Sequence, residues 1–229
     1  MAFGLTYNGG EDFLPIVKYD ARAGRISRRD RGEGGSTDVD ITRSFKAVFD
    51  FENLEVGWIS FPAGGAPSFS MAKVGEPMPP KPSDNHRQGV RIQVKLGKDC
   101  GGDVRELASN AGAFLRGTDK LHDQYLAEVK NNPGKLPVVV LSDSVAETVG
   151  KGDKKSTNYV PVWQIVQWVP RPAELVYKPR SAAPEAAPST APRQGSFGYT
   201  PPSTGSTHAA PPAAPAPAPQ PVAAEEDFG

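Results

Sequence analysis

Cationic side chains are spaced along two segments so that they could bind phosphate groups. In residues 90–96, aliphatic residues alternate with polar ones, which predicts a strand with one aliphatic face and one cationic face. Arg91 and Lys95 lie on the cationic face, and Lys46 is placed similarly in the alternating segment 45–51. Rows of cations follow a phosphate backbone, so the predicted chemistry is noncovalent binding of a polyanion.

Aromatic side chains supply the second part of this chemistry, because flat rings stack on unpaired bases and contribute about 1–3 kcal/mol for each base. Trp58 and Tyr159 lie in or beside predicted strands. Trp163 and Trp168 are five positions apart, so a regular strand places them on opposite faces and buries at most one of them. The residues predicted to contact a single-stranded nucleic acid are Arg22, Arg25, Arg28, Arg29, Lys46, Trp58, Arg91, Lys95, Lys154, Lys155, Tyr159 and Trp163.

Two of these groups of cations lie in predicted loops. The run Arg22–Arg31 contains Gly24 and lies between strands, where it is either a solvated turn or a phosphate contact beside the binding groove. Residues 150–156 suggest a phosphate-binding loop, but Lys154 stands where that motif requires glycine, and no strand-to-helix context follows. We therefore predict a hairpin loop that carries three lysines beside a nucleic-acid groove.

Enzymatic chemistry has weaker support. Asp38 and Asp40 share a face if they lie on a strand and could hold a metal ion, which makes a metal-dependent nuclease an alternative function. The segment Ser83–His86 is the best Asp/His neighbourhood. The sequence has no nucleophile elbow, zinc motif or dinucleotide fingerprint, and Cys100 is its only cysteine. We predict no catalytic residue, no metal and no cofactor.

Composition separates a body from a tail. Half of the 24 prolines lie from Pro179 onward, with Ala and Ser between them, which predicts disordered, extended chain. The 26 basic and 26 acidic residues balance, but the body has a small excess of bases and the tail a small excess of acids. No signal segment is present, and no apolar run reaches the roughly 20 residues that cross a bilayer. We expect a soluble, cytoplasmic protein.

The predicted domains are an N-terminal arm (1–12), a nucleic-acid-binding domain (13–178), a disordered linker (179–221) and an interaction tip (222–229). A capping box from Asp103 to Glu106 predicts a helix that continues to Leu115, and a second helix is predicted from Thr118 to Val129, ended by Pro133-Gly134. Strands are predicted at 16–19, 45–51, 56–61, 90–96, 136–141 and 160–169, with 56–61 as the hairpin partner of 45–51. This pattern indicates a mainly β fold, an OB-fold-like small barrel with a helical insert; a β-sandwich is the alternative.

The C-terminal tip is an acidic cluster with one aromatic ring, formed by Glu225, Glu226, Asp227 and Phe228. In this architecture, and in the segments Gly89–Lys95 and Ser156–Pro161, the chain resembles phage-encoded OB-fold single-stranded DNA-binding proteins. The resemblance implies cooperative, sequence-independent coating of single-stranded DNA in replication, recombination and repair. It also implies recruitment of a polymerase, primase or helicase through the tip.

The tip departs from that family in one respect. Family tails usually end in Phe, whereas Gly229 follows Phe228 here, so a partner pocket must accept a carboxylate that is displaced by one residue. The sequence does not decide whether the chain forms a homo-oligomer. An alternative to the DNA-binding function is a structural role, as a virion or scaffold protein with a Pro/Ala-rich arm.

Overall fold

A computed structural model describes residues 14–180 of the protein. The predicted arm, the linker beyond Arg180 and the tip Glu225–Phe228 lie outside the described residues. The described chain is mainly β, as predicted. Its elements are β1 (Ile16–Asp20), β2 (Arg25–Gly32), β3 (Gly35–Asp40), β4 (Lys46–Phe49), η1 (Phe51–Asn53), β5 (Glu55–Ser60), β6 (Ser68–Lys73), β7 (Arg87–Leu96), η2 (Lys98–Cys100), β8 (Val104–Ser109), α1 (Gly112–Glu128), η3 (Val129–Asn131), β9 (Lys135–Val149), η4 (Gly152–Lys154) and β10 (Ser156–Pro170).

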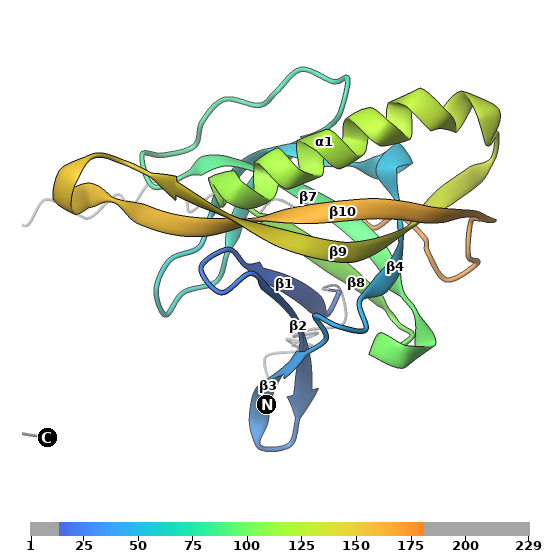
Figure 1. Ribbon diagram of the computed structural model, residues 1–229, viewed down its shortest axis with the longest axis horizontal. Helices are drawn as coiled ribbons and strands as arrows, with labels where there is room; N and C mark the ends of the chain where they lie inside the picture. Colours follow the sequence, from blue (N-terminus) through green and yellow to red (C-terminus); the bar gives the residue numbers. More distant parts are fainter. Residues whose placement is uncertain (1–13, 181–229) are drawn as a thin grey trace, which may run out of the picture. The chain divides into compact units, whose positions relative to one another are not determined.

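The strands form one sheet that curls into a half-barrel (Figure 1). Its path runs β10-β9-β4-β7-β8-β1-β2-β3, and β5 pairs with both β6 and β7. The curl brings β10 to the end of β1, where the Tyr159 N–H donates to the Ala21 carbonyl at 2.6 Å. The Tyr19 hydroxyl donates to the Tyr159 carbonyl at 3.0 Å. These bonds join two parts of the sheet that are about 140 residues apart in sequence.

Strands β4 and β5 lie end to end along one edge of β7. β4 pairs with residues 94–96 of β7, and β5 pairs with residues 87–91. Between them, the Asp50 N–H donates to the Gln93 carbonyl at 3.0 Å. The predicted hairpin between 45–51 and 56–61 is therefore wrong, because the turn η1 kinks the chain without reversing it.

Residues 104–109 form strand β8 rather than the start of a helix. The capping-box prediction is wrong because its polar residues find partners across the sheet: Glu106 accepts a hydrogen bond from Arg91 of β7 at 2.7 Å. One helix, α1, replaces the two predicted helices and includes the second of them from Thr118 to Glu128. The predicted stop at Pro133-Gly134 is confirmed, since the chain turns into β9 there and Gly134 has a φ of 70°.

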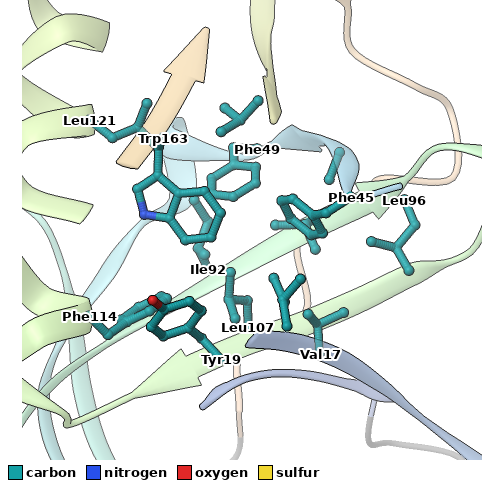
Figure 2. Close-up of a cluster of buried hydrophobic side chains, with 14 of the residues drawn as sticks. Val17, Tyr19, Phe45, Phe49, Ile92, Leu96, Leu107, Phe114, Leu121 and Trp163 are labelled. Carbon is teal, nitrogen blue, oxygen red and sulfur yellow. The ribbon is translucent and has the colours of Figure 1, made fainter. Parts of the chain in front are cut away.

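The core lies between the curled sheet and α1 and surrounds Trp163 (Figure 2). The Trp163 ring is 6.1 Å from Tyr19 of β1, 5.6 Å from Phe45 and 6.2 Å from Phe114 of α1, measured between centroids. Only 4% of Trp163 is exposed. Burial of side chains of this size contributes about 1.5–3 kcal/mol each, so this cluster is the main apolar contribution to stability.

Trp168 lies on the same side of β10 as Trp163, contrary to the prediction of opposite faces. A β-bulge between Ile165 and Gln167 shifts the register by one residue, which reverses the alternation. Trp168 therefore packs against the core and stacks on Tyr125 of α1, with ring centroids 5.8 Å apart.

Strands β9 and β10 form a long hairpin that crosses the molecule in Figure 1. Each strand has 15 residues, and the pairing extends to Val149 and Ser156. The predicted strands 136–141 and 160–169 are confirmed but were too short. The connecting loop comprises 150–155.

Candidate nucleic-acid interface

The outer face of β7, predicted to be an exposed cationic face, is buried. Arg91 is 3% exposed; its Nε donates to Glu106 at 2.7 Å, and its Nη1 donates to Glu55. Burial opposes the charged form of Arg91, but the two carboxylates outweigh burial and raise its pKa. Arg91 therefore neutralises two buried acids and is not placed to contact a nucleic acid, which corrects the prediction.

The segment that covers this face is residues 171–180, the C-terminal strap. The Gln93 side chain donates to the Lys178 carbonyl at 2.6 Å and accepts from the Lys178 N–H at 3.2 Å. Lys95, at the border of the strap, is half-buried and lies 3.5 Å from Glu174. Neither predicted phosphate contact of β7 is therefore an open cation.

The arginine run lies mostly in β2 and faces acids of β3. Arg29 donates to Asp38 through two nitrogens, at 2.7 and 3.0 Å, and Arg25 lies 3.1 Å from Asp40. The hydrogen bond from Arg29 lowers the pKa of Asp38, and hydrogen bonds from Thr42 lower that of Asp40. These exposed pairs contribute about 0–1 kcal/mol each. The two aspartates considered as metal ligands are thus paired with arginines.

Arg28 is also paired within the sheet. Its Nε lies 3.0 Å from Asp30, which accepts a hydrogen bond from Arg105 of β8 at 2.7 Å. Of the predicted arginines, only Arg22 lies in the turn between β1 and β2. Among residues 14–180, no group of three or more possible metal ligands lies together.

The remaining predicted residues lie in different places. Trp58 is half-buried, and its indole N–H donates to the Pro79 carbonyl at 2.9 Å, so the loop after β6 holds this ring. Lys46 is exposed on β4, and Lys155 is exposed just before β10. The side chain of Lys154 lies outside the described residues. Trp163 is in the core, so the prediction that it stacks on a base is wrong.

One end of the half-barrel gathers exposed cations and rings from separate loops. Strands β1 and β8 run parallel, so both end at this end of the barrel. Strand β7 is antiparallel to β8 and begins there, and its antiparallel partner β5 ends there. We name the residues at this end the barrel-end surface; it has one part around Gly24 and a second part at the Phe61 cavity, and it comprises Arg22, Arg25, Arg43, Phe61, Arg87 and Tyr159. Arg25, its partner Asp40 and Arg43 line a cavity of about 570 Å³ next to Gly24 of the β1–β2 turn.

Tyr159 is held against this turn by its backbone and by its ring. Gly24 has a φ of 65°, and a Cβ on it would lie 2.7 Å from the Ser144 hydroxyl and 3.0 Å from the Tyr159 ring. Only glycine allows this close approach. Because Ala21 accepts the Tyr159 N–H, the half-buried ring lies against the turn that carries the exposed Arg22.

Phe61 and Arg87 form the second half of the surface, and sequence reasoning did not select either as a site residue. Phe61 is 48% exposed, and its ring meets Phe69 edge to face at 6.0 Å. Phe61, Arg87 and Asn110 line a cavity of about 500 Å³, where the Asn110 amide donates to the Ile59 carbonyl at 3.1 Å. A ring, a cation and an amide in one cavity can hold a base beside its phosphate. The sequence signal that could have identified Phe61 is an aromatic residue at the end of a strand, directly before a Gly/Pro-rich loop.

No protein-family model, curated protein or solved structure matches the chain. No helix within residues 14–180 is long and apolar enough to span a membrane. The functional conclusion therefore rests on the geometry of the barrel-end surface and on the sequence.

Proposed function

We propose that the protein binds single-stranded DNA with little sequence preference, without covalent chemistry, through the barrel-end surface. The observation that carries this proposal is that exposed cations and two partly exposed rings, Phe61 and Tyr159, lie at the same end of the half-barrel. Cations neutralise phosphates, and rings stack on any unpaired base, so neither contact depends on sequence. Stacking requires unpaired bases, which favours a single strand over a duplex.

The half-barrel supports the finer proposal of an OB-like fold. OB-folds are small, partly open barrels whose loops and neighbouring strands bind oligonucleotides. Here the sheet curls, α1 covers the core, and the proposed surface is built from the β1–β2 turn and the ends of other strands. This arrangement supports the proposal of an OB-like binding barrel.

The family resemblance supports a further proposal about cellular role. The protein would coat single strands in a phage replication or recombination module, in the host cytoplasm. Glu225, Glu226, Asp227 and Phe228 would recruit a replication protein. A stimulation assay with a cognate polymerase or primase tests this role, and loss of stimulation on Phe228→Ala is the expected result.

The binding proposal is tested by fluorescence anisotropy of labelled oligo-dT at two salt concentrations. We expect Tyr159→Ala to cost roughly 1–3 kcal/mol of binding free energy, the contribution of one stacked base. Arg22→Ala should weaken binding and reduce the salt dependence by about 0.7 for one lost phosphate contact. The matched controls are Leu126→Ala and Lys130→Ala, which remove an exposed apolar and an exposed cationic residue elsewhere.

Two outcomes would overturn the proposal. The first is a wild-type protein that does not bind oligo-dT at low salt. The second is an equal loss of affinity in the controls and in the barrel-end variants. Incubating the protein and the same oligonucleotide with magnesium or manganese tests the nuclease alternative. A nuclease would cleave the oligonucleotide, and cleavage would depend on Asp38 and Asp40.

A further inference from the structure

The distal part of the β9–β10 hairpin carries a row of valines, here named the valine face: Val145, Val149, Val160 and Val162. Val145 is 52% exposed, Val149 43% and Val162 39%. Val145 lies directly opposite Val160 across the two strands, and the other two lie an even number of positions away. The four side chains therefore share one face of the hairpin. Val145, Val160 and Val162 are adjacent, while Glu147 separates Val149 from them on β9. Exposed apolar clusters of this kind are typical of interaction sites.

Helix α1 borders the valine face along β10. A Cβ on Gly117 would lie 2.4 Å from the Pro161 carbonyl oxygen, so the helix packs closely on this strand. Arg116 and Lys120 are four positions apart and project on the same side of α1. With three of the valines they line a cavity of about 370 Å³.

Both signs of charge flank the valines. On β9, Asp143 and Glu147 lie on the same face as the valines. Arg116 pairs with Glu147 within the chain. Lys120 and Asp143 are exposed, and neither forms a salt bridge within residues 14–180. The unpaired cation thus lies on the α1 side of the valines and the unpaired acid on the β9 side.

We propose that the valine face is the contact surface between two copies of this chain, related by a two-fold axis. A two-fold contact uses the same patch twice, so the patch must complement itself. Rotation about an axis through the valines buries valine against valine. It also places Lys120 of one copy against Asp143 of the other, in two symmetric pairs. A partner of one net charge would satisfy only one of these residues.

The dimer leaves the barrel-end surface free. Ser144 and Tyr159 alternate with the valines and face the β1–β2 turn, on the opposite side of the hairpin. The inference therefore does not rest on the proposed function.

Sedimentation equilibrium over a concentration series tests the proposal on the full chain. We expect wild-type protein to dimerise and Val145→Glu to weaken dimerisation at least about 10-fold, because a carboxylate would replace an apolar side chain at the centre of the contact. Val176→Glu is the matched control, since Val176 is 61% exposed in the strap. Lys120→Glu should also weaken the dimer, and the double variant Lys120→Glu/Asp143→Lys should restore it.

A cysteine cross-link gives an independent readout. Cys100 is the only native cysteine and is 1% exposed, so Val145→Cys supplies a single reactive thiol. A short bis-maleimide should link Val145→Cys into covalent dimers and leave Val176→Cys monomeric. A wild-type protein that is monomeric at every concentration would overturn the proposal, and so would a dimer that neither Val145→Glu nor Lys120→Glu weakens.

Discussion

Replacing Arg91 with methionine is expected to destabilise the fold severely, because it removes the charge between two buried acids. Glu55 and Glu106 are 5% and 4% exposed. Arg180 still pairs with Glu106 in the variant, whereas Glu55 loses the Arg91 guanidinium and keeps the hydrogen bond from the Tyr177 hydroxyl at 2.7 Å. Removing one partner of a buried ion pair costs about 3–5 kcal/mol. That is a large share of the roughly 5–15 kcal/mol that stabilises a typical domain.

Urea unfolding followed by tryptophan fluorescence measures this cost. With a slope of about 1–3 kcal/mol per molar urea, the midpoint should fall by more than about 1 M. Lys95→Met is the control, because its partner Glu174 is exposed, and it should cost much less stability than Arg91→Met. Adding Glu55→Gln to Arg91→Met should recover part of the loss.

Equal costs for Arg91→Met and Lys95→Met would refute the reasoning. That result would mean that the strap does not exclude water from the outer face of β7. The cationic face predicted from the alternation of residues 90–96 would then be available to phosphates after all.

Three further predictions follow from the same structure. Trp163→Phe should lower the free energy of unfolding by about 0.5–3 kcal/mol and leave oligo-dT affinity unchanged in anisotropy, since the ring is in the core. Gly24→Ala should destabilise the fold, because alanine disfavours the positive φ of this position, and should weaken oligo-dT binding, because the added Cβ displaces the Tyr159 ring. Thermal melts measure the first effect and anisotropy the second. Burial, together with Asp20 for Tyr19 and Glu55 for Tyr177, raises both tyrosine pKa values to about 12. Since unfolded tyrosine titrates near pH 10, the stability from both neutral hydroxyls should be complete below about pH 10 and be lost as pH rises toward 12. Unfolding curves across that range measure the loss, and Tyr177→Phe should reduce it.

Local periodicity was enough to predict several strands but not their partners. The alternation of residues 90–96 gave the correct aliphatic face of β7, with Ile92, Val94 and Leu96 in the core. It could not show that residues 171–180, some 80 positions later, cover the other face. An exposed cation and a buried, neutralised one have the same sequence signal, so Arg91 was assigned to the wrong environment.

Irregular backbone accounts for other errors. A β-bulge in β10 places Trp168 on the same face of the strand as Trp163, and no residue type in 163–168 predicts a bulge. The capping-box pattern of Asp103–Glu106 is equally compatible with a strand whose acids bind arginines across the sheet. Tertiary partners decided between the two.

The candidate site was predicted in part. Arg22, Arg25 and Tyr159 were selected from sequence, and the structure brings them together at the barrel end. Phe61 and Arg87 join them only through the topology of β5, β7 and β8, which depends on long-range strand pairing. No local pattern contains that information.

Photo-crosslinking with an oligo-dT that carries a photoreactive thymine tests the central claim most directly. The full chain is irradiated with the oligonucleotide at low salt, and the linked peptides are mapped by mass spectrometry. The proposed surface predicts cross-links at Tyr159 and Phe61 and in the turn that holds Arg22. Cross-links confined to the strap and to the outer face of β4, or none at all within residues 14–180, would contradict it.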